Sequence, residues 1–101
     1  MSLDRAFSDD GKLLTIFIDE KFDFSQVQGF RTAYSEGTET VTAIVIDLQN
    51  TEYMDSSALG MLLNMQKAMK DKVTSFKIKH AKPQVSRILQ IARFGKKFEF
   101  C

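Results

Sequence analysis

The sequence predicts an α/β fold: a single domain, residues 1–101, with a mixed central sheet of about four to five strands and about three to four helices. Strand-like and helix-like segments alternate along the chain, and strands joined by helices form right-handed crossovers in a partly parallel sheet. The chain has room for one hydrophobic core. Its 44% of hydrophobic and 27% of charged residues are typical of a folded globular protein.

The N-terminal half contains a hairpin, a helix and a central strand. Residues 3–8 are expected to pair with the strand 12–20, KLLTIFIDE, through an Asp9-Asp10-Gly11 turn. Ser25 is expected to cap the next helix and Gly37 to end it. The inward positions of that helix, at helical spacing, are Val27, Phe30, Ala33 and Tyr34. Residues 42–48, TAIVIDL, are almost continuously apolar, which predicts a strand at the centre of the sheet.

The C-terminal half continues the alternation. Residues 57–71 form the longest helix candidate, and 73–79, VTSFKIK, alternate like a strand with one apolar face. Pro83 suits the first turn of a helix that reaches about residue 92, before a last short strand at 98–100. The inward residues of this helix are Val85, Ile88, Leu89 and Ala92.

Charge is divided unevenly along the chain, although the net charge is only +1. Residues 1–60 hold four basic residues against eleven acidic ones, and residues 61–101 hold ten against two. A basic half can indicate nucleic-acid binding. The basic residues are mostly isolated, however, and no basic-aromatic motif accompanies them, so no nucleic-acid partner is expected.

The N-terminal stretch MSLDRAFSDDGK has neither the basic nor the apolar region of a signal peptide. No apolar run approaches the roughly 18 residues that a membrane helix needs. We therefore expect a cytoplasmic protein without a membrane partner. The only cysteine, Cys101, is the last residue, so no disulfide framework is expected.

Residues that could catalyse a reaction are few, and we expect no enzyme, no metal and no cofactor. His80 is the only histidine, no His/Cys cluster has metal-ligand spacing, and no glycine-rich phosphate loop is present. Cys101 has no activating base in view. A serine nucleophile at Ser56 or Ser57 would lack the Gly-x-Ser-x-Gly elbow.

Residues 54–60, MDSSALG, stand directly before the longest helix. Any of Asp55, Ser56 and Ser57 can accept a hydrogen bond from the free N–H groups of its first turn. The same N–H groups and the helix dipole tolerate added negative charge. A phosphate on either serine would therefore leave the helix intact and change the sign of the local surface.

The apolar residues of this helix cover an arc of roughly 220°, wider than a core-facing stripe requires. Leu59, Leu62, Leu63 and Met69 are expected to face the sheet. Met61, Met65 and Ala68 would then form a second ridge beside Asn64, and exposed methionines suit binding surfaces. Alternatively, Met61 and Met65 pack under the helix of residues 84–92. Gly60 weakens the helix by about 1 kcal/mol relative to Ala, which a close approach of the sheet or of a partner would explain.

The stretch IVIDLQNTEYMDSSALGMLL resembles the central motif of STAS domains, above all the stand-alone anti-sigma factor antagonists. Asp47-Leu48, Tyr53-Met54 and residues 55–60 match that family in order and spacing. Upstream, EKFDFS is similar to the family segment that follows the second strand, with Asp23 at its acidic position. Ala58 and Glu20 stand where the family usually has glycine, which leaves the acceptor serine untouched but puts the loop near Asp23 in doubt.

The resemblance implies a partner switch. The serine after the motif aspartate, here Ser56, is phosphorylated by an anti-sigma factor/serine-protein kinase of the histidine-kinase-like ATPase fold, and a metal-dependent serine phosphatase reverses this. The unphosphorylated form binds the kinase or anti-sigma partner, and the phosphorylated form releases it. The family pattern selects Ser56, whereas the physical argument alone also allows Ser57. The partner-binding residues expected on this basis are Asp23, Asp55, Ser57, Gly60, Met61, Asn64 and Met65.

Two other functions remain open from the sequence. The domain could be an unswitched STAS scaffold in a larger regulatory complex, in which case Ser56 would not be phosphorylated. It could also be a small enzyme or ligand-binding module that uses Asp23, Asp55 and Ser56. The sequence names neither the partner nor the output, whether a sigma factor, motility, biofilm formation or a stress response.

Overall fold

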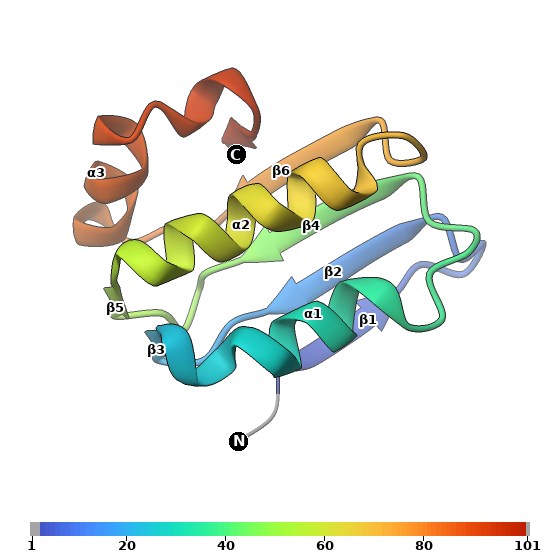
Figure 1. Cartoon of the computed structure of the whole chain (residues 1–101), viewed down its shortest axis with the longest axis horizontal. Coiled ribbons are helices and arrows are strands. Elements are labelled where there is room, and N and C mark those ends of the chain that lie inside the picture. The colour runs from blue at the N-terminus through green and yellow to red at the C-terminus, as the bar shows by residue number, and fades with distance from the viewer. Residues whose placement is uncertain (1–2, 101) are drawn as a thin grey trace.

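The computed structural model describes residues 3–100 as one α/β layer structure, in which helices pack on one face of a five-stranded sheet (Figure 1). Cys101 lies outside the described residues. The strand order is β1-β2-β4-β6-β7, and a second sheet pairs β3 with β5. The strands are β1 (Asp4–Phe7), β2 (Leu13–Phe17), β3 (Lys21–Phe22), β4 (Ala43–Asp47), β5 (Tyr53–Met54), β6 (Ser75–Lys79) and β7 (Glu99–Phe100).

Three α-helices connect the parallel strands: α1 (Val27–Ser35), α2 (Ser56–Met69) and α3 (Pro83–Ile91). Two short 3₁₀ helices, η1 (Phe24–Gln26) and η2 (Phe94–Lys96), precede α1 and β7. The β1–β2 hairpin is antiparallel, and the strands β2, β4, β6 and β7 run parallel to one another. The predicted mixed sheet, the N-terminal hairpin and the alternation of its strands with three helices are therefore confirmed, whereas β3, β5 and the small sheet they form were not predicted.

Alternation along the strands separates a buried sheet face from an open one. The buried face lies under α1 and α2, which run side by side across the sheet in Figure 1. Its side chains are those of Leu14, Ile16, Ile44, Ile46, Phe76 and Ile78. The alternate residues, including Leu13, Thr15, Ala43, Ser75 and Lys77, are exposed or half-buried on the other face. The alternation in β6 confirms the single apolar face predicted for residues 73–79, whereas in β4 Val45 and Asp47 on the other face are buried as well.

α1 begins differently from the prediction. Asp23 caps the 3₁₀ turn η1 by accepting a hydrogen bond from the Ser25 N–H at 3.0 Å, and Gln26 precedes α1 without a side-chain cap, so the assignment of the cap to Ser25 was wrong. A single 3₁₀ turn separates this cap from α1. The rings of Phe22 and Phe30, 5.3 Å apart, then fix the helix to the core. Gly37, with φ +69°, lies two residues after the helix end, where it was expected to stop the helix.

Arg5 ties the edge strand β1 to the other end of α1. Its guanidinium donates hydrogen bonds to the carbonyl oxygens of Ala33 and Glu36. Carbonyls in the last turn of a helix have no partner within the helix, and a cation there also interacts favourably with the negative end of the helix dipole. The edge strand thus stabilises the helix that follows β3.

α2 buries a different face from the one expected. Met61 and Met65 are 6% and 0% exposed, whereas Leu63 is 39% exposed. The expected exposed methionine ridge is wrong, and so is the placement of Leu63 against the sheet. Met61 borders a small recess whose other walls include Val27 and Tyr34, so α1 covers it rather than α3. The helix therefore turns an Asn64–Leu63 edge to solvent.

This orientation of α2 gives a stability prediction. Replacing the fully buried Leu62 by Ala should lower the free energy of unfolding by about 2–5 kcal/mol, because it removes buried methyl groups and leaves a cavity. Leu63→Ala, the adjacent control, should cost less than about 1 kcal/mol because half-exposed leucines bury little surface. Urea unfolding followed by circular dichroism measures both. Equal losses for the two variants would contradict the helix orientation.

Candidate functional site

The site of interest is built on the two-stranded sheet of β3 and β5. These strands are parallel, with Lys21 opposite Tyr53 and Phe22 opposite Met54, and the Asp55 N–H donates to the Phe22 carbonyl at 3.4 Å. Phe22 and Met54 are buried, so the pair is anchored in the core. Because each strand ends at a paired residue, the two segments that follow, from Asp23 and from Asp55, start side by side at one end of the sheet (Figure 1).

Both segments begin with the same capping arrangement, an aspartate followed two residues later by a serine. Asp55 Oδ1 accepts hydrogen bonds from the Ser57 hydroxyl at 2.6 Å and from the Ala58 N–H at 3.1 Å. Asp23 Oδ1 accepts from the Ser25 hydroxyl at 2.6 Å and from its N–H at 3.0 Å. Each carboxylate thereby satisfies an N–H group in the first turn of its helical segment.

These hydrogen bonds favour the charged form of Asp55. The Ser57 hydroxyl is the largest cause that lowers the pKa of the Asp55 carboxyl below its ordinary value, and the Ala58 N–H adds to it, against a smaller opposing effect of desolvation. Asp55 is therefore an anion at neutral pH and a fixed negative charge at the start of α2.

The two adjacent serines differ in what their hydroxyls do. Ser57 is half-buried, and its hydroxyl is bonded to the Asp55 carboxylate. Ser56 is exposed as the first residue of α2, and within residues 3–100 its hydroxyl makes no hydrogen bond. The family resemblance selected Ser56 and the physical argument from the sequence left both serines open; in the structure the Ser57 hydroxyl is hydrogen-bonded and the Ser56 side chain is exposed.

The position of Ser56 in the α2 segment is matched by Phe24 in the α1 segment, since each directly follows its capping aspartate. The Phe24 side chain is 70% exposed, and Tyr53 of β5 is also exposed. Exposed aromatic side chains in or directly after paired strands can contribute to one interaction surface when they lie together. Sequence reasoning missed Phe24, and the repeated Asp-x-Ser pattern around it was the signal that could have found it.

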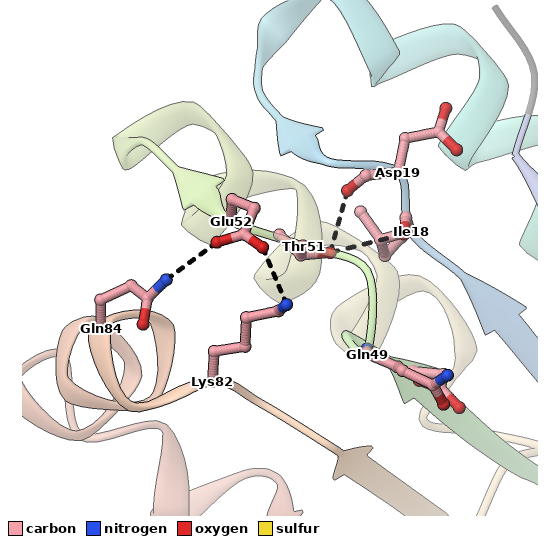
Figure 2. A network of polar contacts seen from close by, with 8 residues as sticks. Ile18, Asp19, Gln49, Thr51, Glu52, Lys82 and Gln84 are labelled. Atoms are coloured by element: carbon pink, nitrogen blue, oxygen red, sulfur yellow. Dashed lines mark hydrogen bonds and ion pairs between the residues drawn. The ribbon is translucent and has the colours of Figure 1, made fainter.

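A network of polar contacts holds the loop that leads into β5 (Figure 2). The hydroxyl of Thr51, which is fully buried, donates to the Asp19 carbonyl at 3.0 Å, with the Ile18 carbonyl at 3.4 Å. The next residue, Glu52, forms an ion pair of 2.8 Å with Lys82 and accepts from Gln84 Nε2 at 3.3 Å. The loop before the site is thus fastened both to the end of β2 and to the start of α3.

The other residues expected at the site fall into two groups. Gly60 and Asn64 are exposed on α2, one and two turns after Ser56, and share its side of the helix. Nothing lies within 4 Å of the position that a Gly60 Cβ would take, so the expected close approach of the sheet is wrong. The side chains of Met61 and Met65 lie in the core and offer a partner no exposed surface.

Three further features of the described residues concern metal ligands, the single histidine and helix length. Residues 3–100 contain no group of three or more His, Cys, Asp or Glu side chains placed to hold a metal ion. His80 is exposed, and its Nδ1 atom lies 3.1 Å from a carboxylate oxygen of the buried Asp47. This contact fixes the orientation of the imidazole ring. No helix in this part of the chain is long and apolar enough to cross a membrane.

Comparison with known proteins agrees with this geometry. The STAS domain family profile matches residues 7–101. The chain belongs to the STAS domain family. A STAS-domain containing protein of Pseudomonas aeruginosa (strain UCBPP-PA14) is 38% identical over 99 residues, which is 98% of each chain.

Among solved structures, this STAS domain is similar to the anti-sigma factor antagonist SpoIIAA in its unphosphorylated form, with a TM-score of 0.80 and 19% identity over 99% of this chain and 88% of that one. It is also similar to the Bacillus cell fate determinant SpoIIAA in the phosphorylated form, with a TM-score of 0.70 and 17% identity over 99% and 91% of the two chains. At these identities the likeness shows the fold alone, and that fold is the one expected for a STAS domain.

The cap of α2 in this STAS domain gives a pH prediction. Because the folded state lowers the pKa of Asp55, its stabilising effect is complete above the unfolded-state pKa of about 4 and is lost as the pH falls through the lower, folded-state value. The stability difference between wild type and Asp55→Asn should therefore be constant from neutral pH to about pH 5 and shrink below pH 4. Urea unfolding of both proteins at a series of pH values measures it. A difference that grows on acidification would contradict the assigned cap.

Proposed function

We propose that this STAS domain is a phosphorylation-controlled partner-switching regulator. The unphosphorylated form binds an anti-sigma factor/serine kinase partner, and phosphorylation of Ser56 releases that partner. The observation that carries the proposal is the exposed hydroxyl of Ser56 at the first position of α2, directly after the capping Asp55 and without a hydrogen bond among residues 3–100. In this role the domain is the substrate of a kinase and not itself an enzyme.

The start of α2 suits a phosphate without a change of fold. The cap uses the Asp55 carboxylate and leaves the Ser56 side chain out of the hydrogen bonds that define the helix start. The first turn of a helix favours anions, since its N–H groups and dipole point toward them. A phosphate that adds about two negative charges there changes the surface while the buried side of α2 keeps its contacts.

The surface around Ser56 explains why a phosphate would release a partner. Phe24, Tyr53 and Leu63 provide exposed apolar area near the capped helix starts, and Asp23 and Asp55 supply negative charge. A partner that covers this area must remove water from the Ser56 side chain and from any phosphate attached to it. Burying an unpaired dianion there is costly, and a loss of about 3 kcal/mol weakens binding more than a hundredfold.

The nature of the partners follows from the family resemblance. A kinase of the histidine-kinase-like ATPase fold would phosphorylate Ser56, and a metal-dependent serine phosphatase would restore it. The likeness to SpoIIAA, whose structure is known in unphosphorylated and phosphorylated forms, supports this assignment. Gly60, Asn64 and Leu63 on the exposed side of α2, together with Asp23, Asp55 and Ser57, would complete the contact surface in place of Met61 and Met65.

Substitutions at Ser56 test the switch. Ser56→Ala should bind the partner constitutively, and Ser56→Asp or Ser56→Glu should bind at least about a hundredfold more weakly because each brings a buried charge to the interface. Ser56→Ala used as bait in a lysate of the native organism recovers the partner, and calorimetry with the purified partner then gives each affinity.

Ser57 provides the matched control. Ser57→Ala should still be phosphorylated by the partner kinase, whereas Ser56→Ala should not, as mass spectrometry of the modified site would show. Phosphate found on Ser57 instead would show that Ser57, and not Ser56, is the phosphorylated residue. Equal affinities for wild type, Ser56→Ala and Ser56→Asp, with no phosphate in native cells, would indicate an unswitched scaffold.

Phe24 tests the extent of the interface. Phe24→Ala should weaken partner binding about tenfold or more, because exposed aromatic residues at the centre of an interface contribute much of its affinity. Ile91→Ala is the control, since Ile91 is 75% exposed but lies at the end of α3. Both variants should unfold at the same urea concentration as wild type. Equal effects of the two substitutions on affinity would show that Phe24 does not belong to the interface.

A further inference from the structure

The second face of the five-stranded sheet carries no helix among residues 3–100. β2, β4, β6 and β7 run parallel and follow one another across the sheet in chain order, so right-handed crossovers place the helices that connect them on one face. In Figure 1, α1 and α2 lie in front of the sheet, and the second face points away from the viewer. Parallel strands are usually covered on both faces. The uncovered side, the open face, is therefore a candidate contact surface.

The centre of the open face is largely apolar and slightly hollow. The side chains that β2 and β4 turn outward are those of Leu13, Thr15, Phe17, Ala43, Val45 and Asp47. A recess of about 210 Å³ lies at this centre, lined by Leu13, Ala43, Val45, Ser75, Lys77 and Lys79. Lysines cover apolar surface with their stems while their ammonium groups stay in water. The recess can thus take up an apolar side chain of a second molecule.

Exposed charges stand at the two sides of the open face. The strand register aligns its residues in rows, and the row at the end of β2 consists of Asp4, Phe17, Asp47 and Lys79. This row begins with an acid on β1 and ends with a base on β6. Both end residues are exposed, and the ion pairs found within residues 3–100 include neither of them. Each of these two charges can therefore pair with a charge of a second molecule.

The other charged strand residues of this face are balanced within the chain. Asp47 is 7% exposed, and its carboxylate accepts from the Gln49 N–H at 2.9 Å and lies 3.1 Å from Nδ1 of His80. Lys77 and Glu99 lie opposite each other on β6 and β7, and their charges have opposite signs. What remains is a negative charge at the β1 side and a positive charge at the β6 side. Such a surface is complementary to a copy of itself rotated by 180°.

A two-fold axis between β2 and β4, parallel to the strands, matches these features. It sets β1 of one copy over β6 of the other, and β2 over β4. Asp4 of each copy then faces Lys79 of the other. In the same way Leu13 faces Ala43, a large side chain over a small one at the recess. Sheets packed face to face cross at about −30°, and the long lysine stem spans the displacement at the ends of the rows. An axis on β4 would instead set Asp47 against Asp47.

We propose that the open face is the interface of a homodimer, in which two copies pack sheet against sheet about this axis. Two Asp4–Lys79 ion pairs link the copies, and each Leu13 fills the recess of the other copy. A standard interface buries about 800 Å² per partner, and the broad faces of this molecule, whose extents are 33 × 30 × 21 Å, have room for it. α2 lies on the other side of the sheet, so the dimer carries two outward-facing Ser56 surfaces and forms whether or not Ser56 is phosphorylated.

Sedimentation equilibrium of the whole protein tests the dimer, at low salt and with a reducing agent that keeps Cys101 from cross-linking two copies. Wild type should show a reversible monomer–dimer equilibrium with a dissociation constant of about 100 µM or lower. Asp4→Lys and Lys79→Glu should each raise this constant about tenfold or more, because each creates two like-charge contacts. The double variant Asp4→Lys/Lys79→Glu should return it to within about threefold of wild type. Within one chain the two residues are three strand spacings apart, about 14 Å, so this rescue comes from contact between copies.

Leu13 and Leu63 form a matched pair on opposite sides of the sheet, 36% and 39% exposed. Leu13→Asp should leave the protein monomeric, because dimerisation would bury the new carboxylate over Ala43. Leu63→Asp should dimerise like wild type. Urea unfolding of each variant checks that it is folded.

The homodimer is excluded if wild type stays monomeric up to about 1 mM, or if the double charge variant dimerises no better than the single ones. Dissociation by Leu63→Asp and not by Leu13→Asp would place the contact on the helix side instead. A monomeric Ser56→Asp variant would contradict the proposal as well, since that residue lies on the opposite face. None of these measurements uses the Ser56 partner, so a monomeric protein leaves the switch standing, and failure of the switch leaves the dimer standing.

Discussion

The parallel pairing of β3 and β5 is the contact on which the geometry of the Ser56 surface rests. Two strands of two residues would not be stable alone, and they persist because Phe22 and Met54 are buried in the core. Their register aligns Asp23 with Asp55, so two helical segments start from adjacent points with equivalent caps. Without this pair, the start of α2 would still be capped but would have no aromatic neighbour at its side.

The start of α2 divides two tasks between neighbouring residues. Asp55 and Ser57 complete the cap, a carboxylate bonded to a hydroxyl and to a backbone N–H. Ser56 stands between them and takes no part in it. Capping and acceptance of a phosphate draw on the same electrostatic preference of a helix start for anions, and in the proposed switch they fall to different side chains. A modification can therefore change the surface without removing the interaction that begins the helix.

Sequence patterns predicted the order of elements and the hairpin well, because alternation and helical spacing extend over many residues. They failed where the answer depends on a neighbouring element. The apolar arc of α2 is too broad to predict which of its edges α1 covers. Met61 and Met65 were therefore expected to be exposed and Leu63 to be buried, and the structure shows the reverse. Strands of two residues have no periodicity to detect, so β3, β5 and their pairing could not be predicted, and only the repeated Asp-x-Ser pattern marks the two caps in the sequence.

The buried hydroxyl of Thr51 bears on how fast such a surface can respond. By bonding to the end of β2 it holds the loop before β5 to the central sheet, and opening that loop would expose a polar group that is now satisfied. Segments held in this way move little on the time scale of loop fluctuations. In the proposed switch, a change of charge at the start of α2 would therefore act on a surface that is already in place, with no segment that must first refold.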